Sequence, residues 1–350
     1  MPIAVEFLPV GDSDGDAILI QYGDSTGYRL NLVDGGYAQN GEKVIEHIEQ
    51  HYGRDVVINN MVVSHADNDH AAGLIPVFKR FKVGALWMNR PWIYANQIID
   101  QFHGNWTLQG WIADVRSKHE YLVELEAIAR SRGMEPQAVF QGSQVGPFHI
   151  LAPSPQRYIS LVPYLDKTPP PYRSELKPQS FAAQALGLLE HLKETVDIET
   201  LDQNPPSTSH SNETSVVQLG IYDNRKILLT ADVGPEGFLE AAQCAYNHGI
   251  LDPPDLIQIP HQGSRRNVTP GVLNAWLGQP NCGAPLRGTA MVMVGAKKSD
   301  HPRNKVKNAF IRRGYPVFVG RTGWIRMPYG YESRGVSLTA ESFSYDVEYD

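Results

Sequence analysis

The stretch MVVSHADNDHAAGL, at residues 61–74, constrains the fold of this 350-residue chain most strongly. An apolar run leads directly into His65, Asp67, Asp69 and His70, and apolar residues then return. A buried strand that ends this way presents two imidazoles and two carboxylates on one short loop. These groups are the usual ligands for zinc, manganese and iron. A capping aspartate or a surface histidine would explain any one of the four, but not the cluster.

Three later apolar runs also stop at a residue able to bind a metal. ILLTADVG ends on Asp232, LIQIPHQGS ends on His261, and MVMVGAKKSDHPRN leads to His301. Taken singly, each is more typical of a helix cap or a surface residue. Taken together they predict one shared site, because α/β sheets build their sites at the ends of strands.

The periodicity of the remaining residues indicates a layered α/β fold. Strand patterns and helix patterns alternate through the first third of the chain, and the alternation resumes after residue 210. We expect strands over 3–10, 16–23, 28–36, 58–64, 83–89, 148–154, 214–234 (two strands), 255–264, 290–296 and 316–320, and helices over 42–52, 74–81, 118–131, 235–249 and 304–314.

Residues 155–210 interrupt this pattern with a segment rich in proline and polar residues. We interpret 1–350 as a single domain and 155–210 as an insertion within it, with one helix over 180–196. The insertion would serve as a lid, a flexible arm or a docking element for a protein partner. A disordered spacer around one helix is the alternative.

Composition narrows the class of protein. The net charge of −7 does not indicate a surface built for nucleic acid, but the charges are uneven. Residues 1–70 carry twelve acidic and three basic residues, whereas 287–326 carry ten basic residues and one acidic. This asymmetry predicts either an anionic partner on one side and a cation on the other, or two solvated faces that differ. With two cysteines, no apolar run of 18 residues and no signal peptide, we expect a cytoplasmic protein without a membrane segment.

The ordered set of motifs resembles the metallo-β-lactamase-fold hydrolases. Within them it is most similar to the nuclease-like domain of the bacterial competence DNA-uptake channel (ComEC-type), without its membrane part. The likeness is carried by six segments and covers most of the chain outside the insertion and parts of 90–145. The segments are Val10–Ile20, Ser64–Gly73, Asn212–Val217, Leu228–Asp232, Pro260–Ser264 and His301–Pro302.

The resemblance implies a four-layer αββα sandwich of two mixed sheets, with one or two divalent metals in a groove at one edge. By this likeness His65 and Asp67 would hold the first metal, and Asp69, His70 and His261 the second. Asp232 would bridge them. It also implies that Asp16 and Asp34 support the metal loop from behind.

Several departures from the family pattern bear on the metal. Asp67 stands where most members have histidine, and the third histidine of the first site is missing, with Asn212 or Glu213 in that region. Gln262 replaces a histidine and Ala231 replaces a glycine. The resulting set is richer in oxygen, which favours manganese or magnesium beside zinc at one position, and it also allows a single metal.

The resemblance implies hydrolysis by a metal-activated hydroxide, with Asp69 and His301 as catalytic residues. Asp69 would orient the nucleophile, and His301 would stabilise developing charge or protonate the leaving oxygen. Basic residues near the strand ends would bind substrate phosphates together with Asn212, unless they are ordinary surface charge: Arg265, Arg266, Lys297 and Lys298.

Three functions remain open at this stage. The first is a metal-dependent phosphodiesterase or nuclease, with a phosphodiester or nucleic acid as substrate. The second keeps the fold but hydrolyses a lactone, lactam or thioester. The third is a catalytically degenerate metal-binding scaffold or sensor, for which the missing histidines argue.

Overall fold

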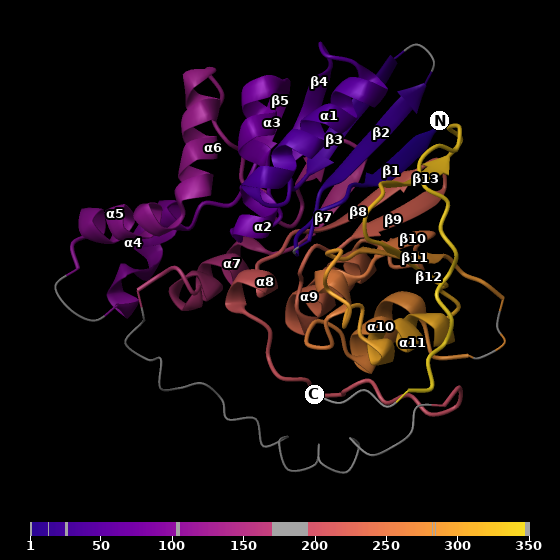
Figure 1. The fold of residues 1–350 in the computed structure, drawn as a ribbon. Helices are drawn as coiled ribbons and strands as arrows, with labels where there is room; N and C mark the ends of the chain where they lie inside the picture. The colour runs from indigo at the N-terminus through magenta and orange to yellow at the C-terminus, as the bar shows by residue number, and fades with distance from the viewer. Residues whose placement is uncertain are drawn as a thin grey trace.

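The computed structural model describes residues 2–12, 14–24, 27–102, 106–169, 195–281, 283 and 285–346. Two mixed β-sheets pack face to face with helices on both outer sides (Figure 1). The four-layer αββα sandwich predicted from the sequence is therefore confirmed. Within the described residues no helix combines the length and the apolar character needed to cross a membrane.

The first sheet has the strand order β13-β1-β2-β3-β4-β5. Its first four strands pair antiparallel, whereas β3, β4 and β5 run parallel. The strands are β1 (Ile3–Phe7), β2 (Ile18–Asp24), β3 (Gly27–Val33), β4 (Val57–Val62), β5 (Lys82–Trp87) and β13 (Ile325–Tyr329).

The second sheet has the order β12-β11-β10-β9-β8-β7-β6, antiparallel from β6 to β9 and parallel from β9 to β12. Its strands are β6 (Gln144–Val145), β7 (Phe148–Ala152), β8 (Val217–Tyr222), β9 (Arg225–Leu229), β10 (Leu256–Gln258), β11 (Thr289–Met293) and β12 (Val317–Gly320).

The helices lie in two outer layers and at the rim of the sandwich (Figure 1). Beside the first sheet and at the rim are α1 (Gly41–Tyr52), α2 (Asn68–Ala71), α3 (Leu74–Arg80), α4 (Ala95–Ile98), α5 (Leu108–Lys118), α6 (Glu120–Ser131), α7 (Pro155–Leu161) and α8 (His210–Glu213). Covering the second sheet are α9 (Pro235–Asn247), α10 (Pro270–Leu277) and α11 (Asn304–Arg312).

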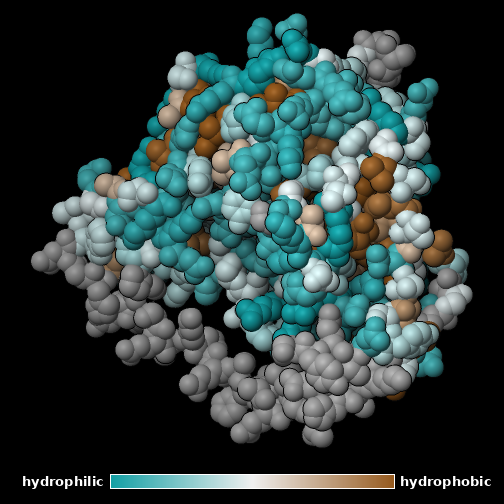
Figure 2. All heavy atoms as spheres, in the orientation of Figure 1, coloured by the Kyte–Doolittle hydropathy of each residue, from teal (hydrophilic) through white to brown (hydrophobic). Residues whose placement is uncertain are grey.

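Strand alternation explains why four layers form, because successive side chains point to opposite faces. In β2, Ile18 and Ile20 enter the core between the sheets, whereas Leu19 packs under the outer helices. In β9, Ile227 and Leu229 face the first sheet while Leu228 faces α9 and α10. Three apolar cores thus separate four layers. The face shown in Figure 2 is mainly hydrophilic, as expected where the cores lie inside.

Two of the sequence predictions about elements need correction or comment. The strand predicted over 255–264 ends at Gln258, and a short 3₁₀ turn over Pro260–Gly263 follows it. The chain turns there because His261 and Gln262 adopt positive φ angles of 46° and 54°, which no strand contains. The helix predicted over 180–196 lies outside the described residues, apart from its last two positions.

Candidate metal centre

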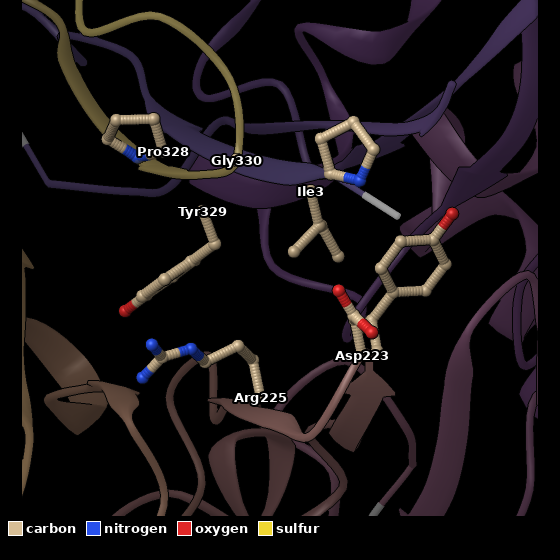
Figure 3. Close-up of a pocket in the computed structure, with 8 residues that line it drawn as sticks. Ile3, Asp223, Arg225, Pro328, Tyr329 and Gly330 are labelled. Atoms are coloured by element: carbon tan, nitrogen blue, oxygen red, sulfur yellow. The ribbon is translucent and has the colours of Figure 1, made fainter.

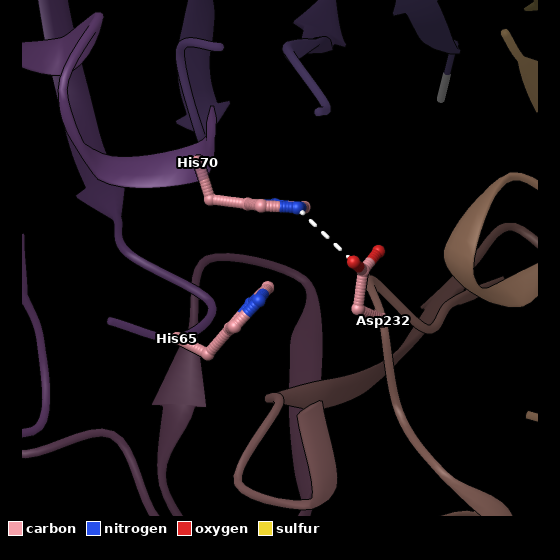
Figure 4. A group of neighbouring side chains, drawn as sticks. All are labelled: His65, His70 and Asp232. Carbon is pink, nitrogen blue, oxygen red and sulfur yellow. Dashed lines mark ion pairs between the residues drawn. The ribbon is translucent and has the colours of Figure 1, made fainter. Parts of the chain in front are cut away.

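The predicted ligands come together at the carboxyl ends of strands from both sheets. The loop after β4 brings His65 and His70, and the loop after β9 brings Asp232 (Figure 4). One ligand atom from each of these three residues lies within 4.8 Å of the others. The three residues are buried, so the group lies inside the molecule rather than in open solvent.

Asp34, directly after β3, fixes the orientation of His70. Its carboxylate accepts hydrogen bonds from Ser64 N (2.8 Å), from Ser64 Oγ (2.5 Å) and from His70 Nδ1 (2.8 Å). The proton of His70 is thereby held on Nδ1, and the Nε2 lone pair is left for the cleft. Asp34 adopts φ 58°, a conformation that aspartate tolerates better than most residues.

His65 also has a contact at each of its ring nitrogens. Ser64 Oγ lies 3.0 Å from His65 Nδ1, and Nε2 lies 3.5 Å from Asp67 Oδ2. Asp67 is itself fixed by a 2.6 Å hydrogen bond from Ser211 Oγ on α8. Asp67 thus lies beside His65, as the ligand pattern predicts for one metal position.

The buried nitrogens of these two histidines make the case for a metal. The Nε2 atoms of His65 and His70 are buried and have no hydrogen-bond partner. An unpaired buried polar atom is costly, so each such atom in a well-packed protein calls for an explanation. The two Nε2 atoms lie 3.4–3.9 Å from the carboxylates of Asp67, Asp69 and Asp232, and this set of donors fits a divalent cation.

Asp232 stands between two imidazoles. Its Oδ2 atom lies 3.4 Å from His70 Nε2 and 3.5 Å from His261 Nε2. On the far side of its ring, His261 Nδ1 lies 3.0 Å from Asn267 Oδ1, an acceptor that keeps the Nδ1 proton in place and frees Nε2. Ala231, just before Asp232, has φ 45°. A bridging position for Asp232 between two metals is consistent with these distances.

Asp69 lies slightly farther out, with its Oδ2 atom 3.9 Å from His70 Nε2 and its side chain partly exposed. Gly15 packs directly against the backbone of Asp69. A Cβ atom at Gly15 would lie only 2.1 Å from the Asp69 carbonyl oxygen. The close approach of the 11–16 loop therefore sets the position of Asp69.

The carboxylates at this site stabilise positive charge beside them. Burial alone would raise the pKa of Asp232, but His261 and His70 lower it well below its usual range. Burial alone would lower the pKa of His70, but Asp232, Asp34 and Asp69 raise it well above its usual value. Each group stabilises the opposite charge. A bound metal would supply the positive charge that protonated imidazoles otherwise provide.

Asp16 reaches the site through an intermediate residue. Its Oδ2 atom accepts a 2.7 Å hydrogen bond from Gln258 Nε2, and Gln258 Oε1 accepts from the backbone N–H groups of Thr230 and Ala231 at 3.0 Å each. This chain of contacts supports the backbone that carries Asp232. Burial, with the nearby carboxylates of Asp232, Asp34 and Asp69, raises the pKa of Asp16 to about 7 against the lowering effect of His70.

Other predicted residues lie around this centre rather than in it. Asn212 donates to Thr208 Oγ1 (2.9 Å), and its Nδ2 lies 3.2 Å from His261 Nδ1, the ring nitrogen that Asn267 also contacts. Lys298 pairs with Asp14. His301 pairs through Nδ1 with Asp300 at 3.2 Å, and among the described residues no hydrogen bond or ion pair joins it to a predicted ligand.

The two predicted arginines follow His261 on the loop before α10. Arg266 is exposed and its backbone N–H donates to Ser264 Oγ (3.3 Å), whereas Arg265 is half-buried. The binding of substrate phosphates by these two arginines stays a prediction.

Sequence reasoning missed several residues that build this centre. The sequence did offer a signal for Ser64, because this residue directly precedes His65 in the motif. Asn267, Gln258 and Ser211 carried no signal, because amides and hydroxyls of this kind occur throughout surface loops. Only the fold brings them behind the ligands.

A second cavity, of about 550 Å³, opens elsewhere in the molecule (Figure 3). Its lining includes Ile3, Asp223, Arg225 and Tyr329. These residues lie at the start of β1 and at the β8–β9 turn, at the opposite strand ends from the metal ligands. None of the predicted site residues lines this cavity, so we place the candidate site at the metal ligands and not here.

No family model matches this sequence, and no curated protein matches it. Among solved structures, the metallo-β-lactamase fold protein YhfI from Bacillus subtilis is similar, at 12% identity over 94% of this chain and 100% of that one, with a TM-score of 0.43. A putative metallo-β-lactamase from Thermotoga maritima is similar at 10% identity over 73% and 95% of the two chains, with a TM-score of 0.36.

The MEM-A1 subclass B3 metallo-β-lactamase from a soil metagenome library covers 78% of this chain and 85% of its own, at 13% identity and a TM-score of 0.31. Likeness at this level carries no argument about chemistry. The roles of the residues rest on the contacts described above.

Proposed function

We propose that this protein is a metal-dependent hydrolase that cleaves phosphodiester bonds. One observation carries the proposal: the buried residues His65, His70 and Asp232 bring their ligand atoms within 4.8 Å of one another, and the Nε2 atoms of both histidines make no hydrogen bond. Imidazoles with fixed tautomers and a shared carboxylate are what a hydrolytic metal site requires. A purely structural histidine pair would have found hydrogen-bond partners.

The chain's own residues prepare this site in advance. Asp34 accepts from His70 Nδ1, and Asn267 Oδ1 lies 3.0 Å from His261 Nδ1, so that the Nε2 atom of each ring faces Asp232. A bound divalent metal would lower the pKa of a water molecule and polarise a phosphoryl oxygen. Asp69, partly exposed beside His70, is placed to accept a proton from that water.

The choice of a phosphodiester over a carboxylic ester rests on the donor set. Three carboxylates, those of Asp67, Asp69 and Asp232, accompany the imidazoles. An oxygen-rich set suits the harder cations that assist phosphoryl transfer, manganese and magnesium, alongside zinc. The basic segment 287–326 does not add to this choice, because most of its side chains are bound within the protein.

Metal analysis of purified protein, followed by hydrolysis of bis(p-nitrophenyl) phosphate and of single-stranded and double-stranded DNA with Mn²⁺, Mg²⁺ and Zn²⁺, tests the proposal. We expect His70→Ala and Asp232→Ala to lose metal and phosphodiesterase activity together. His149→Ala, which removes an exposed histidine on β7, is the matched control and should keep both.

Two results would replace the proposal with another function. If the metal-loaded protein leaves phosphodiesters intact but opens a lactone or a β-lactam, the fold is used for carboxyl chemistry. If it binds metal with high affinity and turns over neither class, it is a metal-binding scaffold.

A further inference from the structure

Most of the cations that the sequence placed near the site are already paired. Lys297 Nζ lies 2.7 Å from Asp12 Oδ2, and Lys298 pairs with Asp14. An ammonium held by a carboxylate offers little net charge to a substrate anion. A cation that is not held in an ion pair would bind a phosphodiester better than these two lysines.

Lys167 meets the requirements for such a cation. Its Nζ donates a 2.7 Å hydrogen bond to Oδ1 of Asn68, which stands between Asp67 and Asp69 in the metal loop. The partner is a neutral amide, and among the described residues no carboxylate pairs with this ammonium. Two of its three N–H groups therefore have no acceptor in the described structure.

The segment that carries Lys167 is well anchored. Thr168 Oγ1 donates to the carbonyl oxygens of Val162 (2.9 Å) and Leu165 (2.8 Å), and both Leu165 and Thr168 are buried. The lysine is itself half-buried. It is therefore held on a fixed turn rather than displayed on a free surface loop, which lowers the entropy lost when it binds.

Neighbouring contacts place this turn beside the segment that carries Asp67 and Asp69. The Tyr164 ring packs against His210 of α8, with 5.5 Å between ring centroids, and the next residue of α8, Ser211, binds Asp67. Burial, and to a smaller extent Lys167, lower the pKa of His119 to about 4 against the raising effects of Val115 and Asp67, so both charges lie near one imidazole.

We propose that Lys167 is a specificity-determining residue that binds a non-bridging phosphoryl oxygen of the substrate. The inference rests on the proposed function and names the cation that recognises its anionic substrate. The ammonium keeps its hydrogen bond to Asn68 while it donates a second one to the phosphate. A neutral ester offers no such anionic oxygen, so Lys167 favours phosphodiesters over carboxylic esters.

A structural role is the competing explanation, in which Lys167 only steadies the metal loop through Asn68. Two variants separate the explanations. Lys167→Met removes the charge and keeps the length of the side chain, whereas Asn68→Ala removes the link and keeps the charge. Lys167→Arg restores the charge, and Lys118→Met, at an exposed lysine on α5 paired with Asp114, is the matched control.

Binding of inorganic phosphate to the metal-loaded protein is measured by isothermal titration calorimetry, and KM and kcat are measured with bis(p-nitrophenyl) phosphate and p-nitrophenyl acetate. We expect Lys167→Met to weaken phosphate binding and to raise KM for the phosphodiester by roughly 10- to 100-fold, the value of one charge-assisted hydrogen bond. Metal content and KM for the acetate should not change. Lys167→Arg should recover most of the loss, and Lys118→Met should behave as wild type.

The inference is overturned if Lys167→Met binds phosphate as the wild type does, if the wild type binds no phosphate, or if Asn68→Ala loses as much as Lys167→Met. Its failure is distinct from failure of the proposed function. Phosphate binding that depends on Lys167 without any phosphodiester hydrolysis would refute the function and keep the inference. Phosphodiester hydrolysis that is indifferent to Lys167→Met would do the reverse.

Discussion

Replacing Asp34 with asparagine should cost this protein its metal while leaving its fold in place. The carboxylate of Asp34 is fully buried and accepts three hydrogen bonds, two from Ser64 and one from His70 Nδ1. Asparagine has nearly the same shape and also tolerates the φ of 58° found here. It has, however, only one acceptor oxygen and presents an N–H₂ group where the second oxygen stood.

Each hydrogen-bond donor and acceptor around residue 34 must still find a partner in this variant. With the amide N–H₂ facing His70, the imidazole avoids two opposed donors only by moving its proton from Nδ1 to Nε2. The protonated Nε2 can no longer bind a metal. Loss of a carboxylate behind a metal-binding histidine typically lowers metal affinity 10- to 100-fold. The exchange of one charge-assisted hydrogen bond for a neutral one should lower the free energy of unfolding by only about 1–2 kcal/mol.

The assay is a titration of the metal-free protein with Zn²⁺ in competition with a chromophoric chelator. Thermal unfolding followed by circular dichroism reports stability, and ¹⁵N NMR of the imidazoles reports the tautomer. Asp55→Asn, at an exposed position before β4, is the control for the same chemical change. Wild-type metal affinity in Asp34→Asn, or a His70 tautomer that does not change, would refute this account of how the site is oriented.

Three further predictions concern stability and metal. Burial alone would raise the pKa of Glu6, but His47, Tyr52 and Arg326 lower it from 4.5 to about 2. The ~3 kcal/mol by which the ionised carboxylate stabilises the fold is therefore present above pH 4.5 and lost as the pH falls toward 2. Denaturant unfolding across pH 2–7 should show that loss in wild type and not in Glu6→Gln. Gly15→Ala, at φ 113° and facing a backbone oxygen 2.1 Å from the new Cβ, should destabilise the protein by roughly 1–3 kcal/mol and weaken metal binding, as calorimetry would show. Removing the metal with a chelator should lower the melting temperature, by the equivalent of about 2.7 kcal/mol if the free metal stood at 100 times its Kd; an unchanged melting temperature would mean that no metal occupies the folded protein.

The parts of the fold that sequence anticipated are those written in local pattern. The helix over 42–52 is found as Gly41–Tyr52, because its apolar residues repeat at helical spacing and a glycine ends it. The loop at 65–70 carries its ligands within six residues, so that its interpretation needed no knowledge of the fold. Asp232 and His261 were also visible, since each follows an apolar run that reads as a strand.

What could not be anticipated depends on contacts between distant residues. Asn267 and Gln258 orient or support ligands, yet their roles exist only because β9 and β10 lie side by side. The turn at His261 replaces a predicted strand because two successive residues take positive φ, and no residue in PHQG other than the glycine signals that conformation. The order of strands, with β13 beside β1, likewise has no local signature.

That strand order also resolves the uneven charge of the chain. The acidic segment 1–70 and the basic segment 287–326 meet each other: Glu6 pairs with Arg326 across β1 and β13, and Asp12 and Asp14 pair with Lys297 and Lys298 beside the metal cleft. Neither of the two interpretations drawn from the sequence, an anionic partner or two solvated faces, takes account of this pairing. The charges that seemed available to a nucleic acid instead form ion pairs between these two segments. Glu6 is buried among its partners, and Gly15 packs against Asp69. The net charge of a segment therefore says little about the substrate of this protein. The case for a phosphodiester depends on the few groups near the metal ligands whose charge is not neutralised by an ion pair.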